Sequence, residues 1–205
     1  MMNRITPIAM RAGLVGAAAL ALSACVSFKS ELPTSLLTLK STASAPAGSG
    51  GTAGGASEVG AIFVLAPETP AKLDVVRVPV NVSDTEIAYI KDAIWVEKPA
   101  RLFRNLLGET LRTRTTALVI DSDDTPTRAG QIVRGTLLEM GYDAATSSAV
   151  VRYEAILVDG EGKAVSRRFE ARESGVLPEA GSVGPAINRA ANTIASEVAD
   201  WVTSA

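Results

Sequence analysis

The sequence contains no histidine and a single cysteine, Cys25, among its 205 residues. Without histidine the chain cannot build a Ser-His-Asp or Cys-His catalytic arrangement, a zinc site that needs imidazole, or the usual general base near neutral pH. With one cysteine it can form neither an intramolecular disulfide nor a thiolate cluster around a metal. These absences exclude most routine enzyme chemistries, and we expect no cofactor and no metal.

Aromatic residues are also scarce, at 4% of the chain, and the lysines and arginines form no basic block. Aromatic stacking platforms and basic stripes are the features by which proteins usually bind nucleic acids. We therefore expect no nucleic-acid partner. The length and the 47% hydrophobic content suffice for one core, so a single domain of roughly 150 residues is expected after the N-terminal segment.

Residues 1–24 have the order of a lipoprotein signal peptide. Arg4 and Arg11 precede an apolar run at 12–22, which is shorter than the about 20 residues that span a bilayer. The sequence LSAC at 22–25 then resembles the bacterial lipobox. That resemblance implies a diacylglyceryl group on the sulfur of Cys25 and cleavage before it, so residues 25–35 would form a lipidated N-terminal segment. The alternative is an ordinary signal peptide in which the cysteine falls at this place by chance.

The residues around the cleavage point also predict a location. Val26 stands where an Asp would favour inner-membrane retention in the enterobacterial sorting rule, so we expect the periplasmic face of the outer membrane. Cleavage would remove Arg4 and Arg11 and make the chain more acidic than its full-length net charge of −2. An acidic body is not attracted to an anionic leaflet, whereas acyl chains contribute ~0.8 kcal/mol per buried CH₂. The lipid would therefore provide the anchoring.

Residues 36–203 are expected to form one domain. Runs rich in β-branched residues predict strands, at 36–40, 61–67, 73–80, 117–122, 131–140, 148–158 and 163–171. The segments 86–90 and 93–97 flank Lys91-Asp92 and predict a hairpin with its turn there. The Ala/Gly/Ser-rich residues 41–57 predict a flexible coil, which is either a tether from the membrane or, as we favour, a long loop inside the domain.

Two segments have the periodicity of amphipathic helices. In residues 99–114 one face is apolar and the other carries Arg101, Arg104, Asn105 and Arg112; the apolar positions are Leu102, Phe103, Leu106, Leu107 and Leu111. The second segment runs from Val183 to Val202, and Gly184-Pro185 predicts its start. The expected fold is therefore an α/β domain with a mixed or antiparallel sheet and two amphipathic helices in layers.

Two clusters of charge are candidate binding sites. Asp121, Asp123 and Asp124 could bind a cation, but the segment lacks the glycine and the distal Glu of a calcium loop, which favours a solvated turn. Arg167, Arg168 and Arg172 could bind phosphate. Since neighbouring residues of a strand point to opposite faces, a solvent-facing Arg167-Arg168 pair is the favoured interpretation.

Three aromatic residues remain. Tyr89 and Trp95 precede the first helix, and Trp201 lies near the end of the second. Each could pack in the core or form an aromatic contact patch. The core is the favoured interpretation for Tyr89 and Trp95, and also for Trp201, which continues the helical stripe. No active site is predicted.

Tyr89, Ala93, Trp95, Pro99 and Leu102 resemble a Y-x-x-x-A-x-W-x-x-x-P segment that runs into a first helix. With the lipobox before it and a closing amphipathic helix after it, the chain looks like a member of the ABC-type transport auxiliary lipoprotein family. This family includes the paraquat-inducible protein C lipoproteins. The resemblance covers nearly the whole chain from Cys25 to Val202.

The resemblance implies a non-enzymatic accessory or docking lipoprotein. Its partner would be the mammalian-cell-entry-domain protein of an ABC transporter that moves lipids between the two membranes of a Gram-negative envelope. Some family members form rings, so the resemblance also implies a homo-oligomeric ring. The first alternative is a structural or assembly lipoprotein of the envelope without a transport role. The second is a hydrolase that uses carboxylates alone.

Overall fold

The computed structural model describes residues 35–51, 60–122 and 130–204. The predictions for the signal peptide, Cys25, Asp123 and Asp124 lie outside these ranges. The described elements are β1 (Ile62–Val64), a 3₁₀ turn η1 (Ala71–Leu73), β2 (Arg77–Ser83), β3 (Glu86–Ile94), α2 (Pro99–Arg112), β4 (Val119–Ile120), β5 (Gln131–Asp143), β6 (Ser148–Asp159), β7 (Ala164–Ser174) and α3 (Ala180–Ser204).

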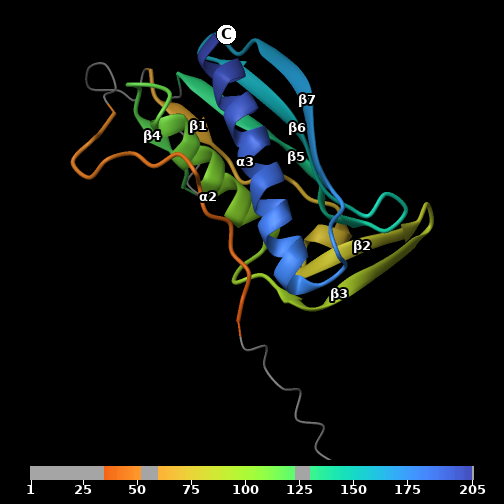
Figure 1. Cartoon of the computed structure of the whole chain (residues 1–205). Helices are drawn as coiled ribbons and strands as arrows, with labels where there is room; N and C mark the ends of the chain where they lie inside the picture. Colours follow the sequence, from red (N-terminus) through yellow and green to blue (C-terminus); the bar gives the residue numbers. More distant parts are fainter. Residues whose placement is uncertain (1–34, 52–59, 123–129, 205) are drawn as a thin grey trace, which may run out of the picture. The chain divides into compact units, whose positions relative to one another are not determined.

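The long strand β5 joins the whole sheet. One of its edges pairs antiparallel with β6, which pairs in turn with β7. Its other edge is shared by two parallel neighbours: β1 pairs at the start, with Ile62 opposite Gln131, and β2 at the end, with Val80 opposite Tyr142. Strands β4 and β3 extend these two branches. The sheet is therefore mixed, as the sequence predicts (Figure 1).

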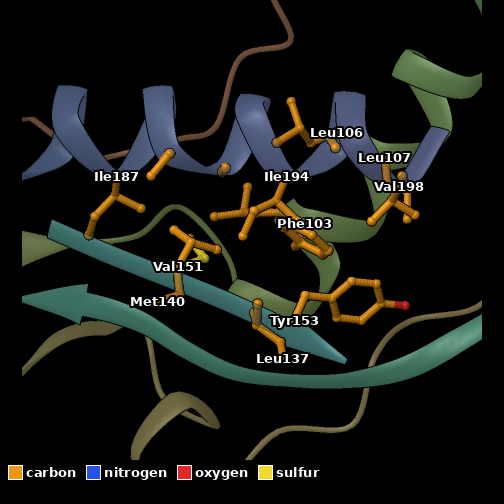
Figure 2. Packing of buried hydrophobic residues seen from close by; sticks show 14 of the residues in the cluster. Phe103, Leu106, Leu107, Leu137, Met140, Val151, Tyr153, Ile187, Ile194 and Val198 are labelled. Atoms are coloured by element: carbon orange, nitrogen blue, oxygen red, sulfur yellow. The ribbon is translucent and has the colours of Figure 1, made fainter. Parts of the chain in front are cut away.

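Both helices contribute to the core that covers the long strands (Figure 2). Pro99 begins α2 at the first helical position, where its missing N–H costs no hydrogen bond. The apolar side of α2 is buried as predicted, and Phe103 lies 5.0 Å from the ring of Tyr153 on β6. Ile187 and Ile194 of α3 lie above the same strands. The predicted α/β domain with two amphipathic helices is thus confirmed.

The predicted hairpin with its turn at Lys91-Asp92 is wrong. The first half and the start of the second belong to the single strand β3, which ends at Ile94 and pairs antiparallel with β2 through the turn at Asp84-Thr85. Asp92 has a φ of 58°, and the register of the β2–β3 pair shifts in this region. A β-bulge accommodates such a residue inside a strand, so a turn-like dipeptide need not end the strand.

Several predicted strands differ in length from those of the structure. Residues 36–40 form only an isolated bridge, Leu37 to Trp95, and β1 keeps three of the seven residues predicted at 61–67. The strand predicted at 73–80 begins four residues later, because η1 occupies the chain up to Leu73 and a bend follows at 74–76. In contrast, the hairpin of β6 and β7 matches the prediction closely.

The helices differ from the prediction at two residues. α3 begins at Ala180 rather than at Gly184, so Pro185 lies inside the helix. A proline there removes only the hydrogen bond to the carbonyl four residues earlier, at Gly181, close to the helix start. Arg104 was expected on the polar face of α2 but is only 6% exposed.

Replacing Phe103 with Ala should lower the free energy of unfolding by about 3–5 kcal/mol, because the fully buried ring leaves a cavity beside Tyr153. Urea unfolding measures this change. The matched control is Val165→Ala on β7, where the side chain is 42% exposed and the expected change stays within about 0.5 kcal/mol. Equal effects of the two substitutions would contradict the position of this core.

Candidate functional site

Cys25 lies outside the described residues, and the structure shows how the first described residues, from 35 on, join the domain. The backbone N–H of Leu37 donates to the carbonyl of Ile94 at 2.7 Å, and Val96 N–H donates to the carbonyl of Leu37 at 2.8 Å. The side chain of Leu37 lies over Gly184 of α3: a Cβ at Gly184 would be 2.6 Å from Leu37 Cδ2. The side chain of Leu37 therefore packs directly on the helix backbone at Gly184.

From Leu37 the chain continues across α3. We call residues 37–45 the strap. Asn188 Oδ1 accepts a hydrogen bond from Lys40 N–H at 2.8 Å, and Asn192 Oδ1 accepts one from Thr42 N–H at 2.8 Å. Asn192 Nδ2 donates to the carbonyl of Lys40 at 3.0 Å.

The spacing of these asparagines explains why they can hold an extended chain. Four residues of a helix advance about 6 Å, and two residues of an extended strand advance about 6.6 Å. Asn188 and Asn192 therefore present their amides at the repeat of alternate strap residues. They bond to the strap backbone much as a neighbouring β-strand would.

The strap ends on α2. Ala45 N–H donates to Glu109 Oε1 at 2.8 Å, and the hydroxyls of Ser41 and Thr110 lie 3.5 Å apart. These contacts hold the first described part of the Ala/Gly/Ser-rich segment against both helices. Only residues 41–51 of the segment predicted at 41–57 are described, and they include the strap's final residues.

Replacing Asn192 with Ala should release the centre of the strap, because it removes the bonds to Thr42 and to Lys40. Hydrogen exchange of the strap amides should accelerate, and the free energy of unfolding should fall by only about 1 kcal/mol. The control is Thr193→Ala, whose exposed hydroxyl bonds only within α3, to the carbonyl of Arg189. Unchanged strap exchange in Asn192→Ala would show that the asparagine does not hold it.

The predicted acidic cluster is only partly described. Asp121 forms an ion pair with Arg112, which also lies 3.5 Å from Glu109. Asp123 and Asp124 lie outside the described residues. Within the described ranges, no group of three His, Cys, Asp or Glu side chains is close enough to hold a metal ion.

The three arginines of the predicted cluster have different partners in the structure. Arg168 pairs with Glu154 on β6, and Arg172 Nε lies 2.6 Å from Glu170 Oε1. Arg167 instead lies over the ring of Phe169, 5.1 Å from its centre. The structure therefore gives these arginines separate partners rather than one shared site.

Glu170 on β7 forms ion pairs with two arginines, Arg152 and Arg172. A hydrogen bond from Arg152, assisted by Arg172, lowers the pKa of Glu170 below its ordinary value. A carboxyl with a lowered pKa stabilises the fold above its unfolded pKa, and this contribution is lost as the pH falls. The site is largely exposed, so solvent screening keeps the contribution small.

The aromatic residues divide between core and surface. Trp95 is 1% exposed, which confirms the core interpretation. Trp201 is partly buried and packs 5.8 Å from the ring of Phe169. Tyr89 is also partly buried, and the guanidinium of Arg77 lies 4.6 Å from its ring centre.

One polar cluster was missed by the sequence reasoning. Lys72 Nζ lies 2.5 Å from Glu139 Oε1 and donates to Asn81 Oδ1 at 3.2 Å, and both charged side chains are mostly buried. The cluster ties η1 to β2 and β5. Its members are up to 67 positions apart, so no local pattern could reveal them.

Among the described helices, none combines the length and the apolar character needed to cross a bilayer.

Comparison with known proteins identifies the fold. No family model and no curated protein sequence matches the chain. The crystal structure of a Xanthomonas campestris protein of family DUF330 is similar, with a TM-score of 0.65 and 14% identity over 82% of this chain and 94% of that chain. That of an uncharacterized protein gives a TM-score of 0.62 and 13% identity, over 74% of this chain and 96% of that one. The DUF330 neighbour is consistent with the family resemblance in the sequence.

Proposed function

We propose that the chain is a lipoprotein of the Gram-negative envelope, anchored to the periplasmic face of the outer membrane through Cys25. It acts as an accessory or docking component of a mammalian-cell-entry-type ABC lipid transport system. The observation that carries the proposal is the lipobox-like LSAC at 22–25, which precedes a domain with the fold of a DUF330 protein.

The described polar groups support a binding role rather than catalysis. Asp121, Glu154 and Glu170 each have an arginine partner, so their charges are used in ion pairs. General acid–base chemistry instead needs a group within reach of substrate whose pKa is close to the working pH. The proposed role is therefore non-enzymatic: the lipid holds the domain at the membrane, and the domain docks the mammalian-cell-entry-domain protein.

Replacing Cys25 with Ser should abolish incorporation of labelled palmitate and release the chain from the outer-membrane fraction, because the sulfur that would carry the lipid is absent. Ser27→Ala, two residues further on, is the control and should leave both unchanged. If cleaved Cys25→Ser protein still fractionates with the outer membrane, acylation does not anchor the chain.

The transport role is tested separately by gentle crosslinking in envelopes. The chain should co-purify with the mammalian-cell-entry-domain protein, together with lipid in the eluate. A Cys25→Ser variant serves as the control, since without the lipid it should no longer be held at the outer membrane. If wild-type protein fails to associate while that partner is demonstrably present, the accessory role is wrong and a structural lipoprotein becomes the better interpretation.

A further inference from the structure

The strand β7 forms one edge of the sheet. Among the described strands it pairs with β6 alone, so its other side has no strand partner there (Figure 1). Its register against β6 is unbroken from Ala164 to Ser174, and it contains no proline, no glycine and no residue with a positive φ. The β3 edge differs, because Asp92 bulges within it. A long and regular edge is a template for pairing with another strand.

Alternate residues of β7 present their backbone groups to this free edge. Asp159 N–H donates to the carbonyl of Lys163 at 3.0 Å, so these two residues form a hydrogen-bonded pair. In an antiparallel ladder such pairs alternate with non-hydrogen-bonded ones. Since Val158 lies opposite Ala164, the odd-numbered residues of β7 bond to β6. The even-numbered residues, from Ala164 to Ser174, therefore point their N–H and C=O groups away from β6.

The charges of β7 favour one way of pairing this strand with a second copy of itself. If the antiparallel pair is centred on Phe169, Ala164 lies opposite Ser174 and the whole strand is paired. Arg168 then lies opposite Glu170 of the second copy, and two-fold symmetry repeats this pair on the other side of the axis. Opposite charges in such a pair contribute roughly 0.2–1 kcal/mol.

The neighbouring registers bring like charges together. Even-numbered residues stay paired with one another only if one strand slides by two residues at a time. A slide in one direction places Arg168 opposite the same residue of the second copy, and a slide in the other direction does so for Glu170. Like charges directly opposite each other destabilise a sheet. Of these three registers, the one centred on Phe169 is free of like-charge pairs.

The ion pairs on this face of the sheet are compatible with the contact. Arg168 pairs with Glu154, while Glu170 pairs with Arg152 and Arg172. The side chains of Arg168 and Glu170 are still 62% and 35% exposed, so each can take a further neighbour. The contact would join the two sets of ion pairs across the axis. Exposed ion pairs contribute little, so the backbone hydrogen bonds, at about 0.5–1.5 kcal/mol each, would provide most of the stability.

From these observations we infer that two copies of the chain associate edge to edge through β7, in an antiparallel pair centred on Phe169, and so form one continuous sheet. The contact is isologous and closes at two copies, unlike the head-to-tail contact that builds a cyclic ring. A single pair of strands makes a small interface, so we expect the dimer to exchange with the monomer. The inference goes beyond the proposed function and does not depend on the transport role.

The test uses the full chain in detergent micelles and two cysteine variants, Ala164→Cys and Ser174→Cys. Both side chains are exposed, and the chain's own single cysteine is Cys25, so crosslinking is measured above the wild-type background. In the proposed register, position 164 of one copy lies opposite position 174 of the other, with about 5.5 Å between Cα atoms, which suits a disulfide. In a dimer of either variant alone, the introduced thiols would be roughly 33 Å apart.

Oxidation of a mixture of the two variants should trap a disulfide-linked dimer, whereas either variant alone should give only the background. Adding Ser166→Pro to both should abolish the crosslink, because it removes an outward N–H, and edge strands tolerate proline at such positions. Ser166→Ala keeps this N–H and is the matched control, so it should leave the crosslink unchanged. Circular dichroism checks that the proline variant is folded.

Two results would overturn the inference. If the mixture crosslinks no better than the separate variants, copies do not pair through β7, and its edge is left for a strand of another protein. If the crosslink survives Ser166→Pro in folded protein, the copies meet without the backbone pairing that the register requires.

Discussion

The close packing of α3 on the long strands is the interaction on which the rest of the domain depends. The buried side of α3 alternates large and small side chains, and its small members are all inaccessible to solvent; they are Ala186, Ala190, Ala191, Ala195 and Ala199. Such small residues let a helix approach its neighbours closely, so that larger side chains such as Ile187 and Ile194 fill the spaces between. α2, the sheet and the strap all contact this one helix.

The elements that were predictable from the sequence are those whose pattern is local. The apolar side of α2 and the alternation of Val151 and Tyr153 on β6 follow from the periods of a helix and a strand, and both sets are buried. The β6–β7 hairpin was equally predictable, because the turn sequence at 159–162 separates two runs of alternating apolar and polar residues. In each case the residues that determine the element lie close together in the sequence.

The features that were missed depend on partners far apart in the chain. The strap bonds to residues about 150 positions later, and its second half, which belongs to the Ala/Gly/Ser-rich segment predicted at 41–57, gives no sign of order in its composition. The Lys72–Glu139 pair and the buried Arg104 are determined by how the sheet and helices come together. The β2–β3 hairpin was misplaced because a positive-φ residue, Asp92, bulges within a strand instead of ending it. The lipobox-like sequence, in contrast, is a local pattern of four consecutive residues, 22–25.

The asparagines of α3 bond mainly to peptide groups of the strap, and Asn192 Oδ1 also accepts a hydrogen bond from the Thr42 hydroxyl at 3.0 Å. What this contact demands of the strap is therefore, first of all, a free N–H at positions 40 and 42. Proline at either position would remove a donor, and a residue without a hydroxyl at position 42 would lose the bond that the Thr42 side chain adds. A low-complexity composition, usually taken as a sign of disorder, is here compatible with a defined path. Much of the specificity of the contact is therefore encoded in the helix, with Leu37 and Thr42 as the contribution of the strap.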